Sequence, residues 1–547
     1  MIIDLYFNTV RQLKLKQIFF QIIRRIYHPK FKPYLLEPIT RTYDNKFIDA
    51  CPEKNSLMNN KTFKFYGEAG NLLDIGWDGN EKEKLWRFNQ HYFNDLNAPD
   101  SNNRIDLHKD LIQDWISSNH SKDSIGLHAY PLSLRIVNWI KWDLRKKKLS
   151  SIAIKSLFAQ GIFLEKSIEH HISGNHLFAN AKALIFLGCY FDGLISQRWL
   201  NKGLKIVFKE LQSQILDDGG NFELSPMYHC IFFKDCLDIL NILRTFNLKE
   251  DAKVKNVSKL LEFKIPKMHD WIKTMTFDDK KVPNFNDSAS NIGPSPLDIR
   301  LYAIKLGFKF KNEIAFEKIN VKHLKASGYI SVQKNDTKIL IDAAKLGPDH
   351  LLAHGHADSL SFELAKQQKS IFINSGTSCY GTGDRRMFER STRAHNTVEI
   401  NKTSSSQVWS TFRVAKRAYP YNLKIYKNKE FLNIECSHDG YQKILNSSLS
   451  HTRFWEVDSR KIIIQDNVKG KYESAIARFI IDPNASIKKI NDNTFIIEND
   501  GVKIEFIIKI GNINLINWES TNNFGYLEST KCFEIGLIQG ISNVEII

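Results

Sequence analysis

The sequence predicts a multidomain α+β protein in which a helical domain precedes a β-sandwich domain. Its 547 residues exceed the roughly 100–250 residues of a typical single domain, so two or three domains are expected. The hydrophobic pattern also changes near residue 320, from helical spacing to short strand-like runs. The expected units are a basic, amphipathic helical lead-in (1–84), a helical domain (85–310), a connection (311–325) and a β-sandwich domain (326–547).

Residues 85–310 carry the helical pattern. Apolar residues recur at intervals of three and four within 132–140, 184–191 and 237–243. Short Gly, Asn and Asp clusters, such as 217–221, separate these segments. Several helices joined by short loops predict helical hairpins stacked in an array.

Residues after 326 carry the strand pattern. Short runs rich in Ile, Val and aromatic residues are separated by turn signals, which is typical of a sandwich. The clearest runs are 329–332, 338–341, 371–373, 397–400, 461–464 and 503–508.

The net charge of +17, from 77 basic and 60 acidic residues, has two interpretations. It follows either from a Lys-, Asn- and Ile-rich composition typical of AT-rich coding, or from a polyanionic partner or an anionic membrane surface. No nucleic-acid-binding motif occurs in its expected context, so we expect no nucleic acid partner. Seven cysteines without a CxxC pair argue against a disulfide framework and a zinc–thiolate site.

Residues 1–36 are aromatic and basic, and they lack the pattern of a secretory signal because Asp4 stands where positive charge is expected. A basic amphipathic helix of this kind can lie on an anionic membrane. The alternative is a helix docked on its own domain. We therefore expect a cytoplasmic or membrane-peripheral protein.

Two polar clusters fall in the helical part. Asn175 and His176 lie where the segment 173–180 opens a helix, and the positive end of a helix favours an anion such as a sugar carboxylate. Tyr228 opens a helix after a proline, and tyrosine can act as a base or an acid. Glu223 with Asp217 or Asp218 could instead form the carboxylate pair of a glycoside hydrolase.

Two further clusters fall in the strand part. On a strand, His354 and His356 would point to one face, which suits a metal ion or one ligand beside one catalytic group. Asp358 would share that face and could orient a ligand. His395 is a candidate third ligand from a separate strand. Arg390 and Arg393 would supply fixed positive charge to an acidic substrate.

Together these clusters resemble the heparinase II/III-like polysaccharide lyases. The resemblance rests on HGHADSLSFEL (354–364), FINSGTSCYG (372–381) and RSTRAHNTVEIN (390–401), in that order. The helical segments SGNHLFAN and GGNFELSPMYH are also similar to that family, so the resemblance covers about residues 85–470. Within that family, the subgroup found among surface-polysaccharide biosynthesis proteins resembles this sequence most.

The resemblance implies an incomplete (α/α) toroid followed by an antiparallel β-sandwich, and β-elimination at a uronic acid. It implies that the Asn175 amide neutralises the uronate carboxylate, because that stabilises an enolate-like intermediate. Tyr228 is then the base or the acid, with His176 and His354 as the other candidates, depending on the C5 epimer.

The resemblance also assigns the remaining site residues. We expect substrate contacts from Glu223, Tyr380, Arg390, Arg393 and Asn396. A zinc-type divalent ion would be held by His356, Asn374 and His395. Asn374 stands where the family often has an aspartate, and a neutral amide is a poorer zinc ligand, so Asp358 could substitute or the ion could be absent.

Three functions follow as hypotheses. The first is a polysaccharide lyase of carbohydrate metabolism, acting on an acidic polysaccharide or a lipid-linked glycan. The second is a glycoside hydrolase on the same toroid. The third is a non-catalytic glycan-binding component of surface-polysaccharide assembly, which would fit a basic lead-in at a membrane.

Overall fold

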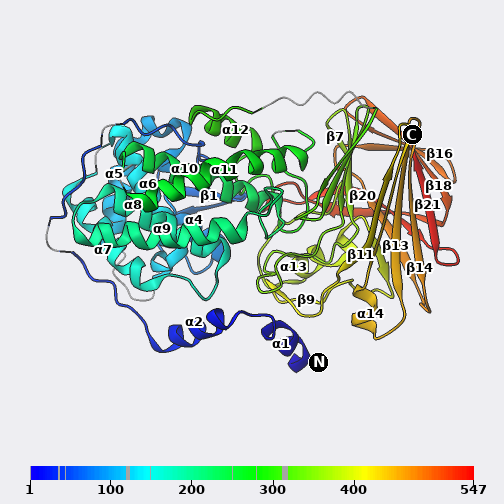
Figure 1. Ribbon diagram of the computed structural model, residues 1–547, viewed down its shortest axis with the longest axis horizontal. Helices are drawn as coiled ribbons and strands as arrows, with labels where there is room; N and C mark the ends of the chain where they lie inside the picture. Colours follow the sequence, from blue (N-terminus) through cyan, green and yellow to red (C-terminus); the bar gives the residue numbers. More distant parts are fainter. Residues whose placement is uncertain are drawn as a thin grey trace.

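The computed structural model describes residues 2–34, 37–43, 45–58, 60–118, 124–147, 149–248, 251–278, 280–310 and 318–547. Figure 1 shows a helical lobe, mostly cyan to green, beside a sheet-rich lobe, coloured from green through yellow to red. The predicted order of a toroid-like helical region and an antiparallel β-domain is confirmed.

The helical lobe has two layers. In the inner helices α6, α8 and α10 almost every residue is buried, whereas α9 and α11 bury only one face. Each inner helix contains one of the segments predicted from apolar spacing. The helices are α4 (Lys84–Gln90), α5 (Ile105–Ser118), α6 (Ala129–Trp142), α7 (Ser151–Ser167), α8 (Gly174–Tyr190), α9 (Leu194–Gln214), α10 (Pro226–Thr245), α11 (Ala252–Thr274) and α12 (Pro296–Lys305).

A buried ion cluster joins the three inner helices. Asp238 of α10 accepts from Lys141 of α6 at 2.6 Å and from Lys182 of α8 at 2.5 Å. Lys182 also pairs with Asp235 at 2.6 Å. Burial opposes the ionised form of Asp238, but the lysines outweigh it and hold its pKa below the ordinary value.

The sheet-rich lobe contains three antiparallel sheets whose side chains fill one core. All six predicted strand runs lie in or next to strands of these sheets. The first sheet is β3 (Ile319–Leu324), β4 (Tyr329–Lys334), β5 (Thr337–Asp342), β6 (Phe362–Lys366) and β7 (Lys369–Phe372). The second runs in the order β11 (Pro420–Lys427), β12 (Phe431–His438), β13 (Ser450–Asp458), β14 (Ile462–Lys469), β21 (Ile541–Ile546), β18 (Val502–Ile510), β17 (Thr494–Asn499) and β16 (Ser486–Asn491). The third runs β19 (Asn512–Ser520), β20 (Glu528–Gly536), β15 (Ala475–Ile480) and β8 (Val398–Ile400).

Smaller elements complete the lobe. A hairpin of β9 (Val408–Trp409) and β10 (Arg413–Val414) and the helices α13 (Asp384–Glu389) and α14 (Gly440–Leu445) lie between the longer strands. The cysteines form no disulfide, and all but Cys379 are buried.

One predicted boundary needs correction, and the predicted lead-in contains more than helices. The lead-in 1–84 contains the helices α1 (Ile2–Val10), α2 (Leu15–Ile26) and α3 (Leu72–Ile75), but also a hairpin of β1 (Thr62–Phe65) and β2 (Glu68–Asn71). In the predicted connection, residues 311–317 lie outside the described residues, and β3 already occupies Ile319–Leu324. Within the described residues, no helix combines the length and apolarity that crossing a bilayer requires.

Replacing Asp238 tests the ion cluster. Asp238→Asn leaves Lys141 buried without its anion, and we expect the free energy of unfolding at pH 7 to fall by about 3–5 kcal/mol. The folded pKa of Asp238 lies below its unfolded value, so its stabilisation is present above about pH 4 and is lost as the pH falls. Urea titrations between pH 3 and pH 7 measure both effects. Asp106→Asn, at a 95%-exposed carboxylate, is the control and should change little; an equally small change for Asp238→Asn would contradict the account.

Candidate functional site

The predicted site residues from the two lobes meet at the lobe interface. Tyr228, at the start of α10, stacks on His354 with ring centroids 3.8 Å apart. Its hydroxyl lies 3.2 Å from that of Tyr380. Ser225 caps α10 and also donates to the carbonyl of Asp287 at 2.7 Å, which ties the first turn of the helix to the interface.

Glu223 connects the helical lobe to His354. Its Oε1 accepts from the backbone N–H of Asn175 at 3.3 Å, and its Oε2 lies 3.4 Å from Nε2 of His354. Gly174 permits this approach, because it has a φ of +55° and an added Cβ would lie 2.8 Å from Oε1. Burial raises the pKa of Glu223 above its ordinary value, although His354 and the N–H of Asn175 oppose the change.

Asn175 and His176 lie at the N-terminus of α8, as predicted. The Asn175 side chain is half-buried, and within the described part of the chain its amide forms no hydrogen bond. His176 is held by Glu169, whose Oε2 lies 3.1 Å from Nδ1, and its ring packs 4.4 Å from that of Tyr130. The Asn175 amide is therefore available to an anion at a positive helix end.

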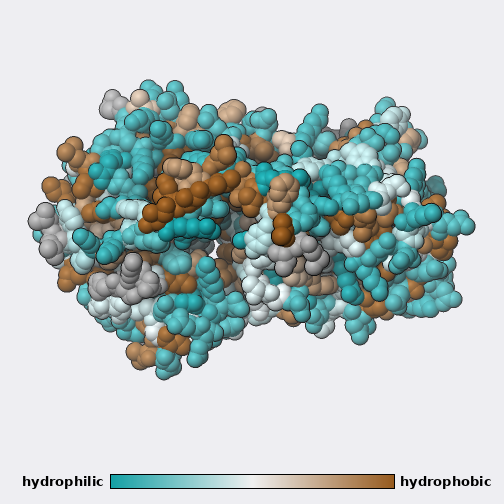
Figure 2. Space-filling view, turned by 90° about the horizontal axis from the view of Figure 1, so that it is seen from below, coloured by the Kyte–Doolittle hydropathy of each residue, from teal (hydrophilic) through white to brown (hydrophobic). Residues whose placement is uncertain are grey.

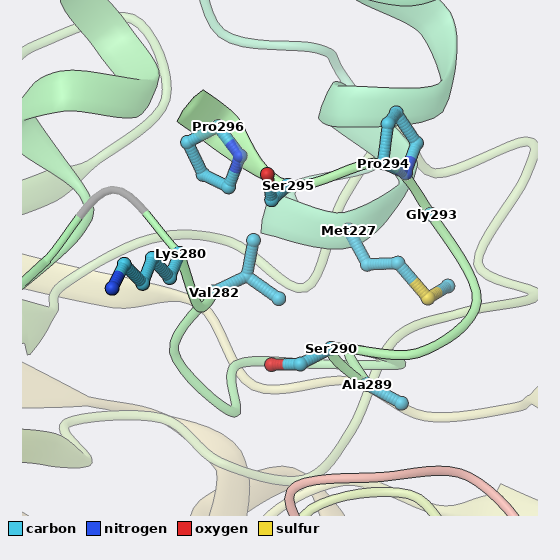
Figure 3. A pocket seen from close by; sticks show the side chains of 9 residues that line it. All are labelled: Met227, Lys280, Val282, Ala289, Ser290, Gly293, Pro294, Ser295 and Pro296. Atoms are coloured by element: carbon cyan, nitrogen blue, oxygen red, sulfur yellow. The ribbon is translucent and has the colours of Figure 1, made fainter. Parts of the chain in front are cut away.

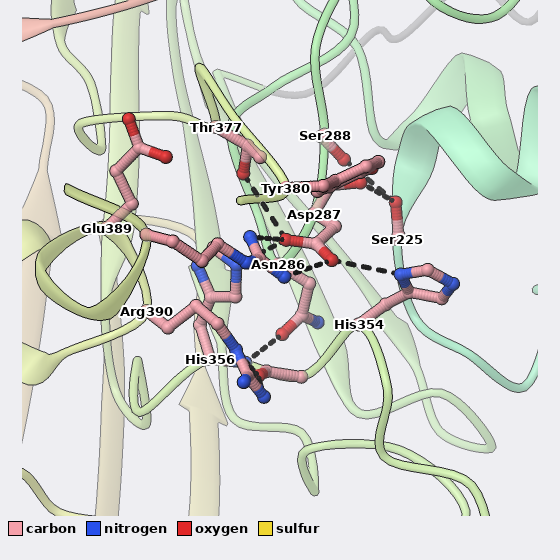
Figure 4. A network of polar contacts seen from close by, with 12 residues as sticks. Ser225, Asn286, Asp287, Ser288, His354, His356, Thr377, Tyr380, Glu389 and Arg390 are labelled. Carbon is pink, nitrogen blue, oxygen red and sulfur yellow. Dashed lines mark hydrogen bonds and ion pairs between the residues drawn. The ribbon is translucent and has the colours of Figure 1, made fainter. Parts of the chain in front are cut away.

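A residue that sequence reasoning missed organises the site. Asp287 is fully buried, and its carboxylate contacts His354, His356 and Arg386. Figure 4 shows its contacts with the two histidines and with the Thr377 hydroxyl, which is 3.5 Å away. Oδ2 lies 2.9 Å from Nδ1 of His354, and Oδ1 lies 2.8 Å from Nε2 of His356. Arg386 of α13 binds both oxygens, one of them at 2.7 Å.

The charge of Asp287 fixes the histidine tautomers. Burial opposes ionisation, but Arg386 and both histidines hold the pKa of Asp287 well below its ordinary value. A carboxylate only accepts hydrogen bonds, so Nδ1 of His354 and Nε2 of His356 must each donate a proton to it. A neutral His354 then carries its lone pair on Nε2, the atom that faces Glu223.

Both tyrosines are protonated in the resting site. Burial raises the pKa of Tyr228 well above its ordinary value, and Tyr380 and Asp287 add to the effect. Burial likewise raises the pKa of Tyr380. Of the two roles that the sequence left open for Tyr228, base or acid, these surroundings favour the acid, because they keep a proton on its hydroxyl.

Of the residues predicted to contact substrate, two are fully buried and a third is exposed beside a tryptophan. Arg390 is fully buried and donates to the carbonyls of Gly355, Ser410 and Thr411. Asn396 is also fully buried and is hydrogen-bonded to main-chain groups. Arg393 is exposed over the ring of Trp518. The predictions for Arg390 and Asn396 are corrected, because their buried side chains are committed to main-chain groups. The substrate contact of Arg393 stays a prediction. Fixed positive charge near the tyrosines comes from Arg386, 5.1 Å from the centroid of the Tyr380 ring.

The predicted strand through His354 is also wrong. Residues 353–360 form a loop, and β6 begins only at Phe362. The two imidazoles converge because both bind Asp287, not because they alternate along a strand. Asp358 is buried beside Asp342, and burial raises its pKa to about 7. It does not orient His356, whose two ring nitrogens contact Asp287 and His395.

The predicted metal ligands are only partly assembled. Nδ1 of His356 faces Nε2 of His395 at 3.2 Å, a separation that suits either a hydrogen bond or two ligands of one ion. The Asn374 amide oxygen instead accepts from the N–H of Asn396 at 3.0 Å. Among the described residues, no three His, Cys, Asp or Glu side chains are grouped to hold a metal. These residues therefore do not fit a three-ligand zinc site.

The carboxylate pair of a glycoside hydrolase is not assembled from the predicted residues. Asp218 accepts from the N–H and the hydroxyl of Ser327, at 2.7 and 2.9 Å, and so joins the lobes. Asp217 is exposed. Glu223 faces Asn175 and His354 instead.

A narrow hollow near the start of α10 is not this site. It has no room for a water molecule, and Tyr228 and His354 do not line it (Figure 3). Its lining consists of Met227, Lys280, Val282, Ala289, Ser290, Gly293, Pro294, Ser295 and Pro296.

Both lobes match known protein families. Residues 143–294 match the family described as heparinase II/III N-terminus, and residues 318–524 match heparinase II/III-like, C-terminal. A heparin-sulfate lyase of Bacteroides stercoris is 24% identical over 335 residues, which are 59% of this chain and 48% of the relative. One of Pedobacter heparinus is 25% identical over 48% of this chain and 41% of the relative. The chain thus spans about half the length of the curated relatives it matches.

Solved structures show the same fold. A crystal structure of heparinase III aligns with a TM-score of 0.66 at 17% identity, covering 88% of this chain and 79% of the other. A heparan sulfate lyase from Pedobacter heparinus aligns with a TM-score of 0.56 at 17% identity, covering 89% and 80%. At this identity the likeness establishes the arrangement of the two lobes.

Metal analysis tests the incomplete ligand set. We expect the purified protein to carry zinc well below one ion per chain, and chelation to leave its thermal midpoint unchanged, because the contact between Asp287, His356 and His395 is complete without an ion. Asn374→Asp supplies the missing anionic oxygen and should raise the zinc content. Inductively coupled plasma mass spectrometry and thermal melts measure both; stoichiometric zinc in the parent protein would contradict this prediction.

Proposed function

The chain belongs to the heparinase II/III-like family, and we propose that it is a polysaccharide lyase that cleaves a uronic-acid-containing acidic glycan by β-elimination. The observation that supports this most is the convergence of Asn175, Tyr228 and His354 at the lobe interface. An anion-binding amide, a protonated hydroxyl and an oriented imidazole are the three groups that this elimination needs.

Asn175 would bind the uronate carboxylate. Its amide is unpaired within the described residues and lies at the N-terminus of the 17-residue α8. Hydrogen bonding and the helix dipole would both reduce the negative charge on the carboxylate. This makes the C5 proton more acidic, because the electron pair left on C5 can delocalise into the carboxylate group.

His354 would take the C5 proton on Nε2. Asp287 holds Nδ1 protonated, and the Asp287 charge stabilises the imidazolium that forms. Besides Asp287, the carboxyl group of Glu223 lies 3.4 Å from Nε2 and therefore close to the proton that Nε2 would accept. The electron pair of the C–H bond becomes the C4–C5 double bond, and the C4–O4 bond breaks.

Tyr228 would donate its proton to the departing O4. Its raised pKa keeps the hydroxyl protonated in the resting site. Its ring lies against His354, so acid and base address adjacent atoms of one sugar. Tyr380 can return a proton to Tyr228 across the 3.2 Å contact between their hydroxyls. The product is an unsaturated uronate at the new non-reducing end.

The substrate would be an acidic polysaccharide or a lipid-linked glycan of surface-polysaccharide metabolism. The net charge of +17 supports a polyanionic substrate. The curated relatives that the chain matches are named heparin-sulfate lyases. Peripheral membrane contact through residues 1–36 would bring the enzyme to a substrate attached to lipid.

A Tyr228→Phe variant tests the elimination. On a panel of acidic polysaccharides, the parent protein should produce the ultraviolet absorbance of an unsaturated uronate. Removing the proton donor should lower kcat/KM by about 10²–10⁴-fold. Tyr426→Phe, at a 61%-exposed tyrosine far along the sheet lobe, should leave the rate unchanged.

Other outcomes would contradict the proposal. New reducing ends without ultraviolet absorbance would indicate hydrolysis. Saturable glycan binding without either product would indicate a non-catalytic component. Equal rates for the parent and Tyr228→Phe would remove Tyr228 from the chemistry.

A further inference from the structure

Helix α2 is amphipathic, but it presents its apolar side to solvent. Leu15, Phe19, Ile22 and Ile26 follow helical spacing and are exposed by 85%, 56%, 53% and 79%. Gln17 is 4% exposed and donates to the carbonyl of His350 at 3.3 Å. A helix docked only on its own domain would bury the apolar stripe, so burial against this chain does not explain the pattern.

Helix α1 also presents apolar side chains to solvent. Ile3, Phe7 and Val10 are exposed by 84%, 63% and 46%. Asn8 is 5% exposed and bonds back to the Asp4 carboxylate at 2.8 Å. Figure 2, seen from the side of these helices, shows a brown band left of centre, in the position of α2 in Figure 1. Two consecutive helices therefore direct apolar side chains outward.

The segment 2–34, here called the strap, is fastened to both lobes. Thr9 accepts from Nε1 of Trp409 at 3.1 Å, and Tyr6 packs edge-on against the same indole at 5.0 Å. At the other end, Phe20 packs 4.6 Å from His170 of the helical lobe. The strap is thus held along its inner side while its apolar side stays free.

Basic residues surround the apolar stripe. The strap carries seven Lys or Arg side chains and a single acidic one, Asp4. All seven basic residues are exposed: Arg11, Lys14, Lys16, Arg24, Arg25, Lys30 and Lys32. Arg24 also contacts His171 of the helical lobe, which leaves the other six for headgroups. Exposed apolar residues flanked by cations are the pattern of a helix that lies in the interface of an anionic bilayer. Two copies meeting through this face would bring like charges together, which disfavours self-association.

We propose that the strap is a docking surface for an anionic lipid bilayer, with Leu15, Phe19, Ile22 and Ile26 entering the acyl region and the cations contacting the headgroups. The 12 residues of α2 form a helix of about 18 Å, long enough to lie in the bilayer plane on one face.

The docked bilayer would lie beside the candidate site. Trp409 belongs to the β9–β10 hairpin, whose Phe412 packs 5.9 Å from His354 and 5.4 Å from Tyr380. His350, which accepts from the strap, lies four residues before His354. Membrane docking would therefore present the site to glycans held at the bilayer surface; this consequence alone depends on the proposed function.

Vesicle co-sedimentation tests the docking. The full chain is mixed with phosphatidylcholine vesicles, with or without 30% phosphatidylglycerol. We expect binding to the anionic vesicles that is at least tenfold stronger than to the neutral ones and that falls with salt. Leu15→Ser/Phe19→Ser/Ile22→Ser should lower it at least tenfold, and Lys14→Glu/Arg25→Glu should abolish the preference for anionic lipid.

A matched control variant and the oligomeric state separate the outcomes. Leu73→Ser/Leu194→Ser removes side chains that are 79% and 91% exposed outside the strap, and should bind vesicles like the parent. Circular dichroism checks that each variant is folded. No binding of the parent to anionic vesicles would overturn the proposal, as would equal binding of the triple variant. A parent dimer abolished by the triple variant, seen by sedimentation velocity without vesicles, would also overturn it. No outcome requires lyase activity, so failure of the proposed function leaves this test intact.

Discussion

One buried carboxylate holds the candidate site together. Asp287 lies at the lobe interface without solvent, and an unpaired carboxylate there would cost several kcal/mol. Arg386 neutralises it from the sheet lobe, and two histidine N–H groups and the Thr377 hydroxyl also donate to it. Because the anion and its partners come from different parts of the chain, forming the site and closing this part of the interface are one event.

The same arrangement explains how each group acquires its chemistry. The Asp287 charge selects the tautomer of His354, and burial beside that charge keeps Tyr228 protonated. Glu223 reaches the pair only because Gly174 leaves space at the start of α8. The groups proposed as acid, base and anion site are therefore set by contacts within and between the lobes and not by any one motif.

The sequence predicted the parts that depend on local pattern. Helical spacing located the inner helices, and the β-rich runs located strands such as β4, β5 and β18, because burial of one face imposes a period that neighbours in sequence reveal. Asn175, Tyr228 and His354 were found through motifs with recognisable residue types.

The parts that depend on tertiary convergence were missed or misassigned. Asp287 stands in a polar loop with no periodic signal, and its role appears only when Arg386 reaches it. Arg390 lies one helical turn after Arg386. No carboxylate bonds its guanidinium group, which donates to main-chain carbonyls instead. The alternation rule failed at His354 and His356 because it applies to a strand, and these residues lie in a loop. The sequence shows that the strap helices are amphipathic, but only the structure shows that their apolar sides face solvent.

The most direct test of this account compares kcat/KM for unsaturated-uronate formation between Asp287→Asn and Asp218→Asn. Both replace a carboxylate that joins the lobes, but only Asp287 contacts His354. The account predicts that Asp287→Asn loses at least about 10²-fold in kcat/KM while Asp218→Asn stays within a few-fold of the parent. Equal kcat/KM for Asp287→Asn and the parent, with both folded, would contradict the central role of Asp287.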